Sequence, residues 1–296
     1  MKILLAIDGS TASQYVVNTA AVRPWPSGTV FCVFSGVDDV GRWEGLPELV
    51  EDAKHEAQSL VKGAADALTQ SGHEVFSEIP LGSPKRTIPE YAKQWGADLV
   101  MVGSHGQSAL TRFLLGSVAQ AVLRASPCSV EIVRPSPAPP SPSVGMKILL
   151  ATDGFECSEK AIYSLANRPW PAKSEIRIVS VVQLPIPEIQ ATASPLSAGY
   201  PPELLEQVWM EERTRAADAA ANARKALIGT GLKLCDGEAT PEGEPRAIIL
   251  DEAKAWGADL IVLGSHGRHG LDRLLMGSVA ESVAVHAHCS VEVVRR

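Results

Sequence analysis

Residues Met1–Gly9 read MKILLAIDG, and the stretch returns as MKILLATDG at Met146–Gly154. In both copies a short apolar run ends abruptly at an Asp-Gly pair. An unbroken run of this kind is typical of a strand that is buried on both faces, as in a parallel sheet. The offset of 145 residues predicts that the chain holds two copies of one α/β unit.

Two further repeats show where the copies differ in length. The motif RPWP at Arg23–Pro26 returns at Arg168–Pro171 with the same offset of 145, whereas GSHG at Gly103–Gly106 returns at Gly264–Gly267 with an offset of 161. The second copy therefore carries 16 additional residues. We expect them in the Pro-rich segment 183–202, where they form a lid over a bound ligand, a contact with a neighbouring molecule, or an idle surface loop.

A segment rich in proline and serine separates the two copies. Residues 135–145 read PSPAPPSPSVG, a composition typical of a semi-rigid linker. We therefore expect one domain over residues 1–134, a linker over 135–145 and a second domain over 146–296.

Strand and helix patterns alternate within each copy. In the first copy we expect helices near residues 10–22, 47–71, 84–94 and 116–125. The apolar runs predict strands at Lys2–Ile7, Val30–Val37, His73–Ile79, Asp98–Val102 and Ser129–Val133. Five strands joined by helices predict a doubly wound, Rossmann-like α/β sheet in each copy. Such sheets bind ligands beyond the carboxyl ends of their strands.

Composition and charge exclude several classes of protein. The 296 residues are 45% hydrophobic and 21% charged, which is unlike a disordered chain. The formal net charge of -7, made of -3 over residues 1–145 and -4 over the rest, argues against a nucleic-acid partner. No apolar run approaches the ~20 residues that span a bilayer. The five cysteines include no CxxC pair, so we expect a cytoplasmic protein with reduced thiols.

A glycine-rich pattern follows the fourth expected strand of each copy. Nine residues separate Gly106 from Gly116-Ser117, and nine separate Gly267 from Gly277-Ser278. Glycine lets the main chain approach a ligand closely, and a helix N-terminus favours an anion. The pattern predicts a phosphate-binding loop in each copy, with a purely structural turn as the alternative.

The chain resembles the universal stress protein family over nearly its whole length, as two tandem domains. The resemblance lies in Asp8 and Asp153 at the end of the first strands and in the loop pattern G-x2-G-x9-G-[ST]. The family implies a five-stranded parallel sheet with strand order 3-2-1-4-5 and helices on both faces. It implies ATP as the ligand, with AMP as an alternative and Mg²⁺ as a companion ion.

The resemblance also implies which residues hold the nucleotide. Asp8 and Asp153 would contact the adenosine end, and the main chain at Gly36 and Val181 would contact adenine. Ribose and phosphates would be held by Gly103, Gly106, Gly116, Ser117 and Val118 in the first copy, and by Gly264, Gly267, Gly277, Ser278 and Val279 in the second.

The two copies differ inside the loop. The second copy has Arg268, which can donate hydrogen bonds to phosphate, where the first has Gln107. It has Gly270 where the first has Ala109. If the two sites differ in affinity, we therefore expect the first to be the weaker one.

Other interpretations stay open at this point. Asp8 and Asp153 are also suitable helix caps. His105 and His266 are candidates for a catalytic role, but without a nucleophile or metal set they are more simply solvated or hydrogen-bonded loop residues. Four tryptophans recur between the copies and suit packing at helix ends: Trp25, Trp95, Trp170 and Trp256.

These observations predict a protein that binds ATP and acts in stress response or signalling, with no catalytic residues assigned. One alternative is a slow ATP-hydrolysing or nucleotidyl-transferring enzyme; another is an interaction module without nucleotide. A dehydrogenase is disfavoured because the first turn lacks G-x-G-x-x-G. The family commonly pairs domains through the last strand, so Ser129–Val133 and Ser290–Val294 would form a pseudo-dimer within the chain or join a second chain.

Overall fold

The computed structural model of the protein describes residues 1–38, 47–106, 115–136, 144–183, 202–235, 239–267 and 276–295. Most of the linker (137–143) and residues 184–201 of the segment in which the 16 additional residues are expected lie outside the described residues. None of the helices in the described part combines the length and the apolar character that a membrane span requires.

Strands and helices alternate along the first half of the chain. Its strands are β1 (Lys2–Ala6), β2 (Val30–Phe34), β3 (Glu74–Glu78), β4 (Leu99–Gly103) and β5 (Ser129–Val133). Its helices are α1 (Thr11–Val22), α2 (Pro47–Gln70), α3 (Pro84–Trp95) and α4 (Ser117–Ala125). The alternation confirms the expected α/β class.

The second half repeats this order of elements. Its strands are β6 (Lys147–Ala151), β7 (Glu175–Val179), β8 (Lys233–Leu234), β9 (Leu260–Gly264) and β10 (Ser290–Val294). Its helices are α5 (Glu156–Ala166), α7 (Pro202–Leu227), α8 (Pro245–Trp256) and α9 (Ser278–His286). The strand β8 is only two residues long, whereas its counterpart β3 has five.

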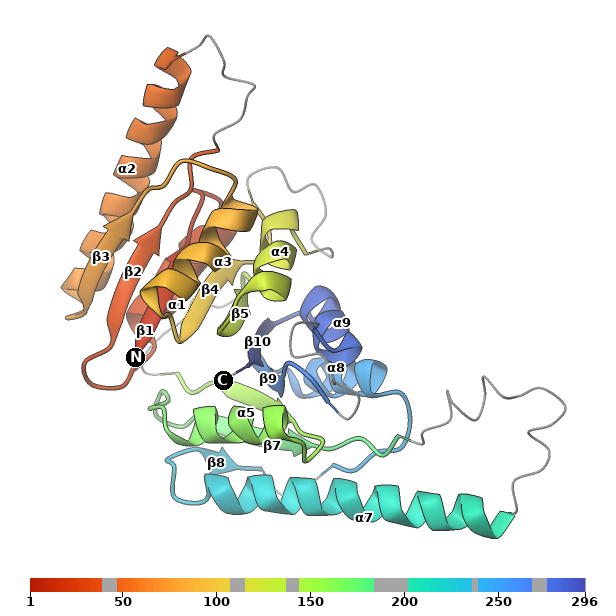
Figure 1. Ribbon diagram of the computed structural model, residues 1–296. Helices are drawn as coiled ribbons and strands as arrows, with labels where there is room; N and C mark the ends of the chain where they lie inside the picture. Colours follow the sequence, from red (N-terminus) through yellow and green to blue (C-terminus); the bar gives the residue numbers. More distant parts are fainter. Residues whose placement is uncertain are drawn as a thin grey trace, which may run out of the picture.

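All these strands join one ten-stranded sheet (Figure 1). Its order is β3-β2-β1-β4-β5-β10-β9-β6-β7-β8, which is the expected 3-2-1-4-5 order in each half. Neighbouring strands within a half are parallel. Parallel strands bring their carboxyl ends to one edge, so the candidate site residues of a half converge there.

The two halves meet where β5 and β10 pair antiparallel, with Glu131 opposite Glu292. The chain therefore contains the pseudo-dimer that the sequence left as one of two arrangements. Each of these strands has a neighbour on both sides, so neither offers a free edge to a second chain.

The core reflects this union of the halves. One apolar cluster runs across the junction and contains Val130 of β5 and Val291 of β10. On the other face each half keeps a cluster of its own, beneath α1 and α2 or beneath α5 and α7. Packing at one face of the sheet is thus shared by both halves.

Some expected boundaries differ from the observed ones. The second strand ends at Phe34 and not at Val37, which forms only an isolated bridge with Leu81. The helix expected near residue 10 begins at Thr11 because the Ser10 hydroxyl caps it, accepting from the Ser13 amide.

Candidate functional site

The turn after β1 positions Asp8 at the carboxyl end of the sheet. The Ser13 hydroxyl and the Ser10 amide donate to Asp8 Oδ1 at 2.7 and 3.1 Å. In turn the Asp8 amide donates to Ser13 Oγ at 3.0 Å. Asp8 is therefore held by the start of α1, but the N-cap of that helix is Ser10, so the capping interpretation of Asp8 is wrong.

The glycine-rich loop lies directly against this turn. A Cβ added at Gly106 would lie 2.7 Å from Asp8 Oδ2, and one at Gly103 would lie 2.8 Å from the Ala12 Cβ. The Ser10 hydroxyl also donates to the His105 carbonyl at 3.3 Å. These two positions have no room for a side chain beside the Asp8 turn.

Gly116 returns the chain to the same place and starts α4. Its amide donates to the Ser104 carbonyl at 2.8 Å, and a Cβ here would lie 3.3 Å from His105 Cα. Gly116 is the N-cap of α4 and gives no side-chain hydrogen bond to the first turn. The amides of Ser117 and Val118 thus begin a helix whose N-terminus is suited to an anion.

The second half builds the same arrangement. A Cβ at Gly267 would lie 2.6 Å from Asp153 Oδ2, and one at Gly264 would lie 2.6 Å from the Cys157 carbonyl carbon. The Gly277 amide donates to the Ser265 carbonyl at 2.8 Å and begins α9 with Ser278 and Val279.

Asp153 differs from Asp8 in its partners. Its Oδ1 accepts from the Phe155 amide at 3.1 Å, while the Ser158 hydroxyl donates to the Phe155 carbonyl instead. Phe155 is the N-cap of α5, so Asp153 does not cap its helix either.

A Ser-His pair sits inside each loop, which the sequence pattern did not reveal as a contact. Nδ1 of His105 lies 3.0 Å from Ser104 Oγ, and Nδ1 of His266 lies 3.0 Å from Ser265 Oγ. Both serines are almost fully buried, at 1% and 2% exposure, so their hydroxyls contact the imidazole rings from inside the protein. Burial, with the Arg295 charge nearby, lowers the pKa of His266.

Three predicted site residues are less closely tied to these clusters. Gly36 and Val181 follow β2 and β7 at the same sheet edge, and a Cβ at Gly36 would meet the Pro84 side chain at 3.3 Å. Among the described residues, no hydrogen bond joins Gly36 or Val181 to the glycine-rich loop. Arg268 lies outside the described residues.

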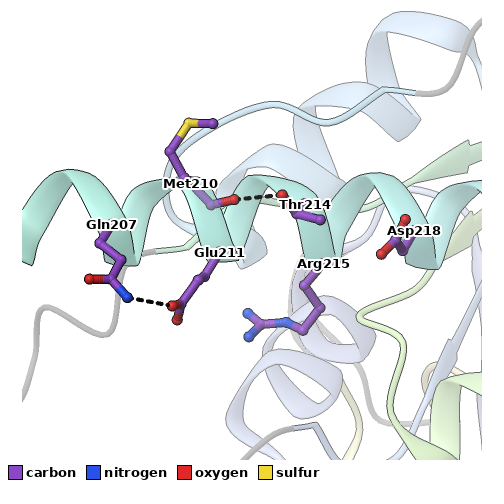
Figure 2. Close-up of a pocket in the computed structure, with 6 residues that line it drawn as sticks. All are labelled: Gln207, Met210, Glu211, Thr214, Arg215 and Asp218. Atoms are coloured by element: carbon purple, nitrogen blue, oxygen red, sulfur yellow. Dashed lines mark hydrogen bonds between the residues drawn. The ribbon is translucent and has the colours of Figure 1, made fainter.

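A pocket along α7 adds a feature that the sequence did not indicate (Figure 2). The residues that line it are Gln207, Met210, Glu211, Thr214, Arg215 and Asp218. Arg215 pairs with buried Glu212 and lies over the Phe155 ring, with 5.7 Å between the guanidinium carbon and the ring centre. An Arg215–Glu212 ion pair therefore lies beside the turn that carries Asp153.

Each half brings a glycine-rich loop, an aspartate and a helix N-terminus to one place. In each half a Cβ on the loop glycine would press against the aspartate carboxylate, and the glycine-rich loop adjoins a helix N-terminus. The buried Nε2 of His266 has no hydrogen-bond partner within the described residues. Among those same residues no three His, Cys, Asp or Glu side chains gather as metal ligands would.

Comparison with known proteins gives a consistent result. The protein-family model described as "Universal stress protein family" matches residues 1–134 and 146–295. A Staphylococcus epidermidis protein named for that family is 34% identical over 137 residues, which span 45% of this chain and 82% of the relative. A Staphylococcus aureus protein named in the same way is 32% identical over 137 residues, with the same coverage of 45% and 82%.

Solved structures share the tandem fold. A universal stress protein from Archaeoglobus fulgidus superposes with a TM-score of 0.67 at 19% identity, covering 100% of this chain and 96% of that one. A functionally unknown protein from Pseudomonas aeruginosa gives a TM-score of 0.58 at 19% identity, covering 99% and 92%. At this identity the likeness concerns the fold.

Proposed function

This chain belongs to the universal stress protein family, and from that premise we propose that it binds ATP, with AMP as the alternative, at two sites. We propose further that it acts as a cytoplasmic stress-response or signalling factor and not as a dedicated enzyme. The domains that carry the sites are residues 1–134 and 146–296, joined by the linker 135–145.

One observation carries the proposal: the same cradle is built twice. In each half an aspartate after the first strand lies against a glycine of the loop. A Cβ added at that glycine would lie 2.7 Å from the aspartate Oδ2 in the first half and 2.6 Å from it in the second. A carboxylate is a strong acceptor for hydroxyl groups, which suits the ribose of the adenosine end. Because it has no Cβ, the glycine lets the loop lie close to this carboxylate.

The phosphates have a second set of partners in each half. Gly116, Ser117 and Val118 begin α4, and Gly277, Ser278 and Val279 begin α9. Unpaired amides and the positive end of the helix dipole favour phosphate oxygens here. Because neither half is basic overall, these local groups would supply most of the attraction, with Mg²⁺ as a companion of the bound phosphates.

We propose that the second site is the tighter one. Arg215 lies over Phe155, next to Asp153, and Arg268 belongs to the same half. In the first half Ser10 stands at the position of Phe155 and Gln107 at that of Arg268. Because Arg215 is paired with Glu212, the positive charge of Arg268 is the difference that would favour the phosphates of the second site.

The proposal is tested by mass spectrometry of small molecules released when the purified chain is denatured. We expect an adenine nucleotide from the wild-type chain and much less from the double variant Gly106→Ala/Gly267→Ala. Finding no adenine nucleotide, together with no ATP binding in calorimetry, would refute it. Turnover of ATP with Mg²⁺, measured on the same sample, distinguishes a binding protein from a slow ATPase.

A further inference from the structure

Two arginines connect each candidate site to the opposite half, and we propose that they act as positioning residues for the site across the junction. Arg134 follows β5 and Arg295 follows β10. The inference rests on the proposed function, because it concerns the same two nucleotide sites. It states that Arg295 positions the first site and Arg134 the second.

Arg295 reaches from the second half to α4 of the first half. Its Nη2 donates to the carbonyl oxygens of Leu123 and Arg124 at 2.6 and 3.1 Å. Its main-chain amide donates to Ser129 Oγ at 3.3 Å. The guanidinium therefore satisfies carbonyls in the last turn of the helix whose first turn begins the first candidate site.

Arg134 makes the corresponding contacts from the first half to the second. Its Nη2 donates to the carbonyl oxygens of Ala284 and Val285 in the last turn of α9, at 2.7 and 3.0 Å. Its amide donates to Ser290 Oγ at 3.1 Å. Arg134 is buried, with 7% of its surface exposed, so water cannot readily replace these hydrogen bonds.

Main-chain hydrogen bonds connect each arginine back to the loop of its own half. The Ser104 amide donates to the Val133 carbonyl, next to Arg134, and the Ser265 amide donates to the Val294 carbonyl, next to Arg295, both at 2.9 Å. The same serines accept from Gly116 and Gly277 at the start of α4 and α9.

These contacts form a closed ring through the molecule. It runs from the first loop through β5 and Arg134 to α9, then through the second loop, β10 and Arg295 back to α4. Figure 1 shows α4 and α9 on either side of the junction of β5 and β10, and an Arg124–Glu281 ion pair joins the two helices. Each site is thus supported by a side chain of the other half.

A short helix transmits such support well. A helix of nine residues is a rod of about 13 Å, so a displaced last turn also displaces the first turn. A cation at the C-terminus is favourable to the helix dipole, whose positive end faces the proposed phosphates. Removing the guanidinium leaves two carbonyls without their donor, so the last turn of the helix is held less firmly in place.

The proposal predicts a crosswise effect on ATP affinity. Calorimetry on the full chain isolates the first site in a Gly267→Ala background and the second in a Gly106→Ala background. We expect Arg295→Ala to weaken the first site about fivefold or more and the second less than about twofold, and Arg134→Ala to do the reverse. Arg86→Ala, which removes an exposed arginine from α3, should change neither.

Several outcomes are distinguishable. The crosswise proposal is overturned if each variant weakens both sites equally, or if neither variant weakens either site. In that case ATP binding by the wild-type chain still supports the proposed function. Absence of ATP binding by the wild-type chain overturns both. Arg295→Lys and Arg134→Lys keep the charge, so they should retain part of the affinity and serve if an alanine variant fails to fold.

Hydrogen exchange without ATP gives an independent readout. We expect Arg295→Ala to speed amide exchange in α4 more than in α9, and Arg134→Ala to speed it in α9 more than in α4. General destabilisation would speed exchange in both helices alike, and that result would contradict a positioning role.

Discussion

The smallest features that decide the candidate sites are single glycines. Their spacing was visible in the sequence, because only the pattern of strand, loop and helix had to be recognised. The contact between Gly106 and Asp8 was not visible, since it depends on how two loops from different parts of the chain meet at one sheet edge. The sequence indicated that His105 is a solvated or hydrogen-bonded loop residue, but it did not indicate that buried Ser104 is the partner.

Gly106→Ala should therefore weaken ATP binding at the first site by about tenfold or more. The new methyl group would lie only 2.7 Å from Asp8 Oδ2 and would therefore displace the Asp8 carboxylate. The ligand would then lose a charge-assisted hydrogen bond. Isothermal titration measures the effect. Gly63→Ala in α2 is the matched control, because its Cβ would meet nothing within 4 Å. It should leave binding unchanged and add about 0.5–1 kcal/mol to the free energy of unfolding.

His266 makes stability depend on pH. Burial, with the Arg295 charge, lowers its pKa in the folded chain below the ordinary value of 6.5. The unfolded chain then binds more protons near pH 6, so this contribution is fully present above pH 6.5 and is lost as the pH falls through the folded pKa.

His266→Gln should flatten this dependence. Denaturant unfolding at pH 7 and pH 5 should give a smaller difference in the free energy of unfolding for the variant than for the wild type. The slope does not vanish, because burial also lowers the pKa of His73 and His288. An unchanged difference would show that His266 titrates alike in both states.

At the scale of elements, the RPWP repeats are explained by the junction of the halves. Arg23 pairs with Glu131 of β5, and Arg168 with Glu292 of β10, all four buried. The indole of Trp25 donates to the Ala20 carbonyl at the end of α1, which confirms that the tryptophan packs at a helix end. The repeat was evident in the sequence, but its buried partner in the last strand was not.

Glu131→Ala should destabilise the chain by about 3–5 kcal/mol, because it leaves the Arg23 guanidinium buried without its counter-ion. Urea unfolding measures the change. Glu51→Ala breaks an exposed pair with Lys54 and should cost about 1 kcal/mol or less. Similar losses for the two variants would contradict the importance of burial.

At the scale of the whole molecule, the fold class and the strand order within each half were predictable from the repeat and from the family resemblance. The choice between pairing within the chain and pairing with a second chain was not. Local sequence gives β5 and β10 the same apolar character in both arrangements. Only the structure shows the antiparallel register that places Glu131 opposite Glu292.

The central claim is that one chain binds two nucleotides. Isothermal titration of the nucleotide-free full chain with ATP and Mg²⁺ tests it most directly. We predict a stoichiometry of two ATP per chain for the wild type, with the second-half site tighter, and of one for Gly106→Ala or Gly267→Ala at ATP concentrations that saturate only the intact site. No binding, or a stoichiometry that neither substitution changes, would contradict the account.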